Sequence, residues 1–330
     1  MTVTFLTGPA GTGKTTYAVA RLREWLTNNI PPSHILVLVP QLTLEQSYRQ
    51  LLRDSSMPAA GAVDILTLNG LAMQTIDLFW PLGASAAGFG RPNDRPIFLD
   101  IEQAEYYLRQ AIEPLLRQGY FDPNVVPITI SLPRLMSQIL DNLNKAALIG
   151  LAHTQVGEHL AASIAVDPSS RVALEHTQAC VNQFRQFCLE RNLLDFSLRI
   201  ETFYQHLWQT EGVRRYLTEH YRYLIVDNIE EDTPFAHSVL RTWLPQTTEA
   251  LLVNDEDAGY RIFLGANWQT AAELQTLADE TIYLTDSHVA PPDILALGER
   301  LGQIILGRPG QPATQLPNQS ITPYGTVYDD

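Results

Sequence analysis

The chain has 330 residues, of which 45% are hydrophobic, enough for a sizeable core in one large domain or two. Its 36 acidic residues outnumber its 22 basic ones, and the formal net charge of −14 excludes an affinity for polyanions that rests on overall charge. No apolar run is long enough to span a bilayer and no signal peptide precedes the first predicted strand, so we expect a cytoplasmic protein without a membrane segment. The two cysteines, Cys180 and Cys188, are predicted to be reduced core residues.

The most specific pattern in the sequence lies near its start. An apolar run, Val3 to Leu6, predicts a buried strand, and Tyr17 to Leu26 predicts a helix. Between them GPAGTGKT completes the phosphate-loop pattern G-x-x-x-x-G-K-[ST]. Glycines there let backbone N–H groups turn inward, and the helix N-terminus adds positive charge. The alternative, a chance glycine-rich turn, is disfavoured because the pattern sits between a predicted strand and a predicted helix.

This loop predicts a site for nucleotide phosphates and Mg²⁺. Lys14 is expected to reach the β- and γ-phosphates, and the Thr15 hydroxyl is expected to ligate the metal. The predicted cofactors are therefore ATP and Mg²⁺. The residues expected to bind the nucleotide are Gly8, Gly11, Thr12, Gly13, Lys14, Thr15 and Thr16.

Strand and helix patterns then alternate, which predicts an α/β fold with a parallel sheet flanked by helices. The expected strands are His34–Pro40, Val63–Leu68, Tyr223–Asp227, Ala250–Asn254 and Thr281–Leu284. The expected helices beside them are Gln41–Arg53, Asn69–Leu78, His237–Trp243 and Ile294–Ile305.

The alternation breaks in the middle of the chain. The residues from Pro81 to Arg95 are rich in Gly, Ala, Ser and Pro and predict an exposed loop at a domain boundary. Helical periods then continue to about His220, as in Glu102–Arg117, Leu132–Leu148 and Arg171–Arg191. We therefore predict an α/β domain from 1–85 and 221–306, a helical insertion at 86–220, and an extended or disordered tail at 307–330.

An acidic cluster at the end of a later strand predicts a second part of the site. YLIVD places Asp227 where a phosphate-loop ATPase holds Mg²⁺, although a plain turn aspartate is the alternative. The next residue, Asn228, stands where a hydrolytic motor carries a glutamate base, and an amide cannot accept the proton. Glu230 and Glu231 are the candidate replacements, or else solvated acids at a helix N-terminus. The candidate catalytic set is thus Lys14, Asp227, Glu230 and Glu231, with Thr15 and Asp227 as metal ligands.

Taken in order, these stretches resemble the N-terminal motor region of superfamily 1 DNA helicases of the UvrD/Rep/PcrA type, including the related AddB subunits. The matching stretches up to about Gly307 are GPAGTGKTT (motif I), VPQLTLEQ (Ia), TLNGLA (Ib), YLIVDNIEEDTP (II), VNDEDAGYRIFLGAN (III) and LTDSHVAPPDIL (IV). The resemblance implies a RecA-like P-loop NTPase domain, subdomain 1A, with a mainly helical inserted subdomain, 1B. It also implies a DNA repair or recombination role.

The departures from the family pattern fall on one chemical step. Asn228 replaces the motif II Glu, Ala258 the motif III Gln, Leu264 the motif III Arg, and His288 the motif IV Arg. Losing a positioned base or a cation on the transferring phosphoryl group costs orders of magnitude in rate. The resemblance therefore implies ATP binding with weak or no hydrolysis. The alternatives are an active DNA-dependent ATPase, completed by a C-terminal half or a partner, and a non-catalytic ATP-binding scaffold subunit.

The family also binds single-stranded DNA, which is therefore one expected partner. The other expected partner is a helicase or nuclease subunit, or the chain's own C-terminal half. The family binds single strands through aromatic and basic side chains on the motor domains. Core packing is the alternative role for the aromatic ones. The candidate contacts are Gln41, Thr67, Asn69, Tyr260, Arg261 and Trp268.

Overall fold

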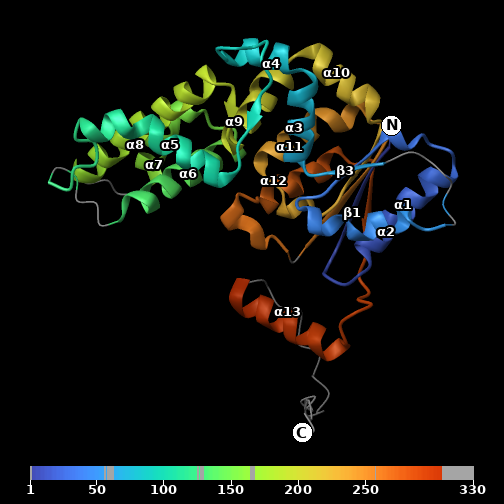
Figure 1. Ribbon diagram of the computed structural model, residues 1–330. Helices are drawn as coiled ribbons and strands as arrows, with labels where there is room; N and C mark the ends of the chain where they lie inside the picture. The colour runs from blue at the N-terminus through green and yellow to red at the C-terminus, as the bar shows by residue number, and fades with distance from the viewer. Residues whose placement is uncertain are drawn as a thin grey trace, which may run out of the picture.

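The computed structural model describes residues 2–55, 57, 63–124, 126, 130–163, 168–256 and 258–306. Its centre is a six-stranded sheet in the order β3-β2-β6-β7-β1-β8, and every pairing in it is parallel, as predicted (Figure 1). The strands are β1 (Thr2–Gly8), β2 (Ile35–Leu38), β3 (Asp64–Leu66), β6 (Tyr223–Val226), β7 (Glu249–Asp255) and β8 (Glu280–Tyr283).

The sheet is buried on both faces, which explains why its strands are continuous apolar runs rather than alternating ones. Alternate side chains of one strand enter different clusters: Leu36 and Leu38 of β2 join the larger core, whereas Ile35 and Val37 join the smaller. The smaller core lies under α1 (Lys14–Thr27) and α2 (Gln46–Leu52). The larger lies under α3 (Leu68–Leu78) and α11 (Pro234–Trp243). The chain is therefore a three-layer α/β structure around the sheet.

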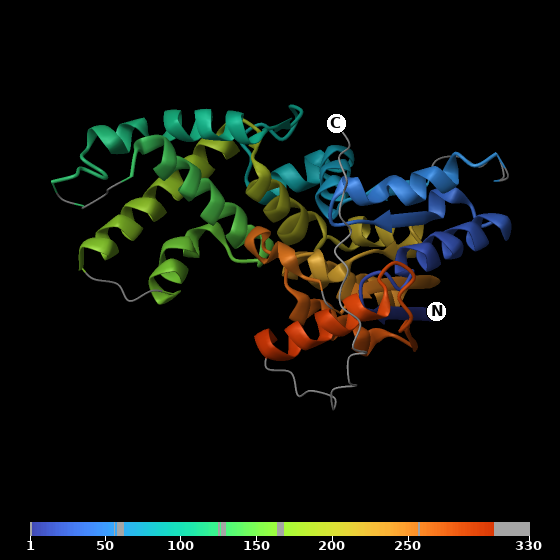
Figure 2. The same ribbon diagram turned by 90° about the horizontal axis from the view of Figure 1, so that it is seen from below.

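A mainly helical part extends from the larger core (Figures 1 and 2). Its elements are α4 (Trp80–Ala87), β4 (Ile97–Phe98), α5 (Ile101–Arg117), α6 (Leu132–Leu148), α7 (Val156–Ser163), α8 (Pro168–Glu190), β5 (Leu193–Leu194), α9 (Phe196–Glu201), a π-helical turn η4 (Thr202–Leu207) and α10 (Glu211–His220). The larger core continues from the sheet region into this helical part, because Phe203 and Trp208 pack on Phe235 and Trp243 of α11. One apolar cluster thus joins this part to the sheet.

The prediction of an exposed loop from Pro81 to Arg95 is wrong for its first half. Residues Trp80–Ala87 form α4, whose Gly83 and Ala84 pack inward, and an α-carbon substituent at Gly83 would lie 3.1 Å from Leu207. Proline is favoured in the first turn of a helix, and the alanines that follow are strong helix formers. The small residues of this stretch therefore allow a close helix contact. The predicted tail at 307–330 lies outside the described residues.

The last described helix, α13 (Pro292–Leu306), follows the segment that leaves β8. Figure 1 shows it below the sheet, with no other helix beside it. Several of its large apolar side chains are exposed, among them Ile294, Leu297, Leu301 and Ile304. Two of the short helices in the sheet region are η7 (Tyr260–Leu264) and α12 (Trp268–Ala272).

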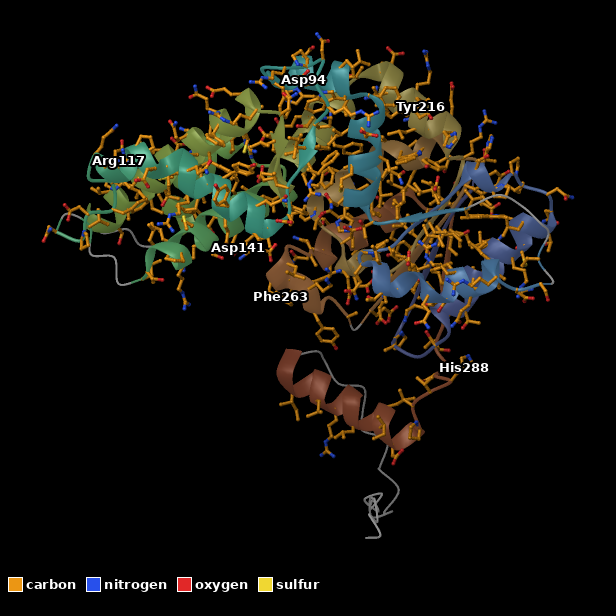
Figure 3. The ribbon with its side chains drawn as sticks, in the orientation of Figure 1. Asp94, Arg117, Asp141, Tyr216, Phe263 and His288 are labelled. Atoms are coloured by element: carbon orange, nitrogen blue, oxygen red, sulfur yellow. The ribbon has the colours of Figure 1, made fainter. Side chains whose placement is uncertain are left out.

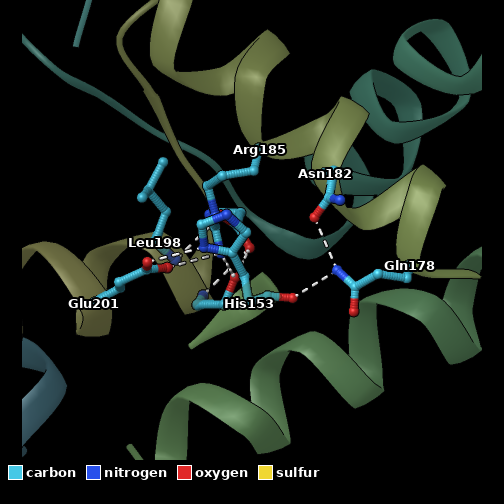
Figure 4. Close-up of polar contacts among 8 residues, drawn as sticks. His153, Gln178, Asn182, Arg185, Leu198 and Glu201 are labelled. Atoms are coloured by element: carbon cyan, nitrogen blue, oxygen red, sulfur yellow. Dashed lines mark hydrogen bonds and ion pairs between the residues drawn. The ribbon is translucent and has the colours of Figure 1, made fainter. Parts of the chain in front are cut away.

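A buried ionic network holds the helical part together. Arg185 of α8 donates to Asp195 Oδ1 at 3.0 Å and lies 3.3 Å from Glu201 Oε2. Glu201 also pairs with His153 Nδ1 at 2.9 Å, and Gln178 donates to the His153 carbonyl at 2.9 Å (Figure 4). Since Asp195 caps the N-terminus of α9, the network ties α8, α9 and the turn at His153 to one another.

Removing the cation of this network should destabilise the protein strongly. We expect Arg185→Ala to lower the free energy of unfolding by about 3–5 kcal/mol, because it leaves buried carboxylates unpaired. The control on the same helix is Arg171→Ala, whose ion pair with Glu175 is exposed, and it should cost less than about 1 kcal/mol. Equilibrium urea unfolding measures both. Equal losses in the two variants would show that the network does not hold the helical part together.

Candidate functional site

The turn from β1 into α1 forms a cradle of backbone groups. Gly13, in the left-handed region at φ 87°, precedes the first residue of α1, and the N–H of Tyr17 donates to its carbonyl at 2.9 Å. Gly8 is required for a different reason, because a Cβ there would lie 2.2 Å from the Leu284 carbonyl oxygen. The first-turn N–H groups of α1 and its dipole make this turn suited to an anion.

Lys14 lies inside the cradle and is only 7% exposed. Its ammonium donates to the carbonyls of Gly8 and Pro9 and lies 3.1 Å from Asp255 Oδ2 at the end of β7. Thr12, on the same turn, donates to the Pro9 carbonyl at 2.9 Å. The lysine is therefore held by the loop itself and by one carboxylate, at the place where the loop would surround phosphate oxygens.

Asp227 follows β6 and is almost completely buried, with 2% of its surface exposed. Its Oδ2 accepts a 2.7 Å hydrogen bond from the Tyr48 hydroxyl, and its Oδ1 is buried without a hydrogen-bond partner of normal geometry. Burial raises the pKa of this carboxyl group, whereas Tyr48, the Asn228 backbone, Lys14 and Thr15 each lower it. A buried carboxylate oxygen without a partner fits a hard cation such as Mg²⁺.

These groups line one cavity of about 710 Å³. It lies at the carboxyl ends of β6, β7 and β1, which are neighbours in the sheet, and ligands of open α/β sheets bind at such ends. The lining residues from the phosphate loop and the strand ends include Gly11, Thr12, Gly13, Lys14, Thr15, Thr16, Asp227, Asn228 and Asp255. The structure thus brings together every predicted nucleotide residue except Gly8, which lies beneath as the end of β1 and binds Lys14.

The segment that follows β8 crosses the open side of this cavity. The His288 backbone N–H donates to the Gly11 carbonyl at 2.9 Å, and both His288 and Val289 line the cavity. Figure 3 shows His288 on the connection between the sheet and α13. The cavity is also lined by Tyr17, Ala20 and Leu284, which are aromatic and aliphatic. Sequence reasoning did not single out Tyr17, although it lies one turn into α1 from Gly13.

Glu230 lies behind the cavity rather than in it. Its Oε1 accepts from the Asn228 side-chain amide at 3.1 Å, and its Oε2 accepts from the backbone N–H of Asp255 at 3.0 Å. The side chain is 1% exposed, and its burial raises the pKa from 4.5 to about 7. Asn228, which is left-handed at φ 53°, therefore separates the Glu230 carboxylate from the cavity.

A second pocket of about 240 Å³ holds several of the predicted nucleic-acid residues and Glu231. Thr67, Asn69 and Arg261 line it, and Arg261 also donates to the Pro40 carbonyl at 3.1 Å. Gln41 does not line the pocket but directly follows Pro40, which does. Glu231 is thus directed to this second pocket and not to the phosphate loop, so the structure separates it from Lys14 and Asp227.

Large apolar side chains project beside this pocket from η7 and α12. Tyr260 and Trp268 were expected at a nucleic-acid surface, and they are 79% and 52% exposed. Phe263, which sequence reasoning did not single out, is 70% exposed and points away from the body of the protein (Figure 3). No pattern in the sequence marked it, because its neighbours Ile262 and Leu264 make the stretch look like core.

A scan against protein-family models and a search of curated proteins found no match to this chain. Within the described ranges, no group of three or more His, Cys, Asp or Glu side chains has the geometry of a metal site. A cation at Asp227 and Thr15 would therefore need phosphate and water oxygens to complete its shell, which is how Mg²⁺ is commonly bound. Among the helices described, none has the length and apolar character needed to cross a membrane.

The buried Glu230 should make stability depend on pH. Between pH 4.5 and about 7 the folded protein keeps a proton on Glu230 that the unfolded chain releases. The stability that protonated Glu230 contributes is therefore fully present below pH 4.5 and is lost as the pH rises through 7. We expect Glu230→Gln to be more stable than the wild type at pH 8, by up to about 3 kcal/mol, and equal to it near pH 4.

Urea unfolding across this pH range measures the effect, with Glu219→Gln on the exposed side of α10 as the control for loss of one charge. A Glu230→Gln difference that stays constant between pH 4 and pH 8 would contradict the assignment.

Proposed function

We propose that this chain is an ATP- and Mg²⁺-binding protein of the superfamily 1 helicase type, corresponding to the N-terminal motor region of UvrD- or AddB-like proteins, with weak or no ATP hydrolysis. The observation that carries the proposal is the convergence of Lys14 and the buried Asp227 on one cavity at the start of α1. The resemblance of the motifs in their order supports a role in DNA repair or recombination.

Nucleotide binding would exchange the internal contacts of the loop for contacts to phosphate. The Lys14 ammonium would leave the carbonyls of Gly8 and Pro9 for oxygens of the β- and γ-phosphates. The cation would lie between Thr15 and the unpaired Oδ1 of Asp227, where it would neutralise charge on the phosphates. The apolar lining residues Tyr17, Ala20 and Leu284 suit the flat face of a base.

Weak hydrolysis follows from what stands next to the cavity. Asn228 faces it with an amide, which cannot take a proton from an attacking water. Glu230 is separated from it by that amide, and Glu231 lines the other pocket. The arrangement can bind a triphosphate and a metal ion, but the residue after Asp227 is an amide and neither of the two glutamates that follow it lines this cavity.

The decisive measurement is ATP·Mg²⁺ binding by calorimetry, with phosphate release followed with and without single-stranded DNA. We expect wild-type protein to bind ATP and to release little phosphate under either condition, and Lys14→Ala to abolish binding. Lys145→Ala is the matched control, because Lys145 is the only other lysine and forms an exposed ion pair with Asp141 on α6. Equal ATP affinity in wild type and Lys14→Ala would refute the nucleotide site.

An active ATPase is the second candidate function, and Glu230 is the observation that favours it. A carboxyl group with a pKa of about 7 is matched to proton transfer at neutral pH, and a shift of Asn228 would connect it to the cavity. DNA-stimulated phosphate release that Glu230→Gln removes would establish this reading. ATP binding without phosphate release would instead support the weakly hydrolysing motor or the ATP-binding scaffold.

Single-stranded nucleic acid is the macromolecule that the exposed aromatic side chains fit best. Tyr260, Phe263 and Trp268 offer flat surfaces within one short stretch, and bases of any sequence stack on such surfaces. Arg261 and Asn69 supply polar groups in the adjoining pocket. The net charge of −14 means that the contact must rest on stacking more than on phosphate attraction.

Removing one stacking ring should weaken this contact without changing nucleotide binding. We expect Phe263→Ala to weaken binding of a fluorescein-labelled oligo(dT) by about 1–3 kcal/mol in an anisotropy titration at low salt. The control is Tyr216→Ala, because Tyr216 is also exposed but lies on α10, far from Phe263 in Figure 3. Unchanged affinity in Phe263→Ala would exclude this surface.

A further inference from the structure

The contact that the function proposed above leaves unexplained is the hydrogen bond between Tyr48 and Asp227. Tyr48 is completely buried, and its hydroxyl donates to Oδ2 of Asp227 at 2.7 Å. The other oxygen of the same carboxylate, Oδ1, has no hydrogen bond of normal geometry although it is also buried. One buried carboxylate thus has one oxygen that is held and one that is available.

The backbone fixes both partners of this hydrogen bond. Asp227 follows β6, and its N–H donates to the carbonyl of Leu38, the last residue of the neighbouring strand β2, at 2.9 Å. Tyr48 belongs to α2, which follows β2 after a 3₁₀ turn at Leu42–Glu45 and packs on α1 in the smaller core. The hydroxyl therefore reaches Asp227 from a helix that is anchored to the adjacent strand.

We propose that Tyr48 is a positioning residue for the metal site. Its hydroxyl occupies Oδ2 of Asp227, so that only Oδ1, together with the Thr15 hydroxyl, is presented to a divalent cation. The inference rests on the proposed nucleotide and Mg²⁺ site. Mg²⁺ demands near-ideal octahedral geometry and few protein ligands, so a carboxylate that binds through one fixed oxygen suits it better than one that is free to rotate. Partners behind a ligand commonly set its orientation and the metal affinity in this way.

The competing explanation is that Tyr48 only satisfies its own buried hydroxyl. The chain contains a contact that separates the two explanations. Tyr221, which is also buried, donates to Asp64 Oδ2 at 2.6 Å, and both residues lie at the amino ends of strands, opposite to the phosphate loop. Tyr221→Phe therefore removes a tyrosine–aspartate hydrogen bond of the same kind from the same sheet without touching the site.

The test is a titration with Mn²⁺ in the presence of ATP, followed by electron paramagnetic resonance, on wild type, Tyr48→Phe and Tyr221→Phe. We expect Tyr48→Phe to weaken Mn²⁺ binding by about 10- to 100-fold and Tyr221→Phe to leave it unchanged. ATP binding measured in EDTA should be the same in all three proteins, because the phosphate loop is intact. A purely structural tyrosine would lower the melting temperature in both variants and change the metal affinity in neither.

The outcomes separate the failure of this inference from the failure of the proposed function. If wild type binds Mn²⁺ and ATP and Tyr48→Phe binds them equally well, the positioning role is wrong and the nucleotide site stands. If wild type binds neither, both are wrong. Should Tyr48→Phe not fold, replacement of Tyr48 by 4-aminophenylalanine keeps a weaker donor at the same place. An Mn²⁺ affinity between those of wild type and Asp227→Asn supports the role, and an affinity equal to wild type overturns it.

Discussion

Lys14 and two carboxylates line one cavity at the carboxyl end of the sheet, and a third buried carboxylate lies behind it. Lys14 pairs with Asp255, Glu230 accepts from the backbone of Asp255, and Asp227 lies across the same cavity. Removing a carboxylate from water is costly, and this desolvation is the main cause that raises the pKa of both Asp227 and Glu230. A divalent cation would supply the missing positive charge.

The segment that follows β8 packs on the glycines of the same loop. At Gly8 and Gly11 the positions that a Cβ would occupy are taken by Leu284 and Val289, and His288 lies in van der Waals contact with Gly13. The glycines therefore serve two purposes, a turn that exposes N–H groups and a surface on which a second segment can lie. His288 is held at the loop by its backbone hydrogen bond to the Gly11 carbonyl and by the contact of its ring with Gly13.

Much of the fold could be predicted because its signals are local. The helix predicted at Leu132–Leu148 has those bounds in the structure, and each predicted strand has a counterpart shifted by a few residues at most. The error at α4 arose because small residues that allow close helix packing have the composition of a loop. The two-residue strands β4 and β5 are too short for any periodic signal and are paired across a long separation, Ile97 with Leu193.

The site was predictable only in part, for the same physical reason. The residues of the phosphate loop are contiguous in the sequence, so they could be recognised as a motif. Tyr48 meets Asp227 across 179 residues, and nothing local marks a tyrosine in an amphipathic helix as a partner of a distant carboxylate. Glu230 and Glu231 are neighbours in sequence, yet the chain directs one behind Asn228 and the other into a different pocket. Local pattern cannot decide that split, because it depends on how the backbone leaves β6.

The position of β1 in the sheet has a consequence for the order of synthesis. Both neighbours of β1, β7 and β8, come from the far end of the described chain, and the Val3 N–H bonds Asp279 across 276 residues. The phosphate loop leaves the ribosome long before β7 and β8, so β1 has no partner until β7 has emerged and lacks its second neighbour until residues beyond 280 have followed. A nucleotide that binds the finished loop would therefore recognise only chains whose sheet is closed, and ligand binding would report the completion of folding.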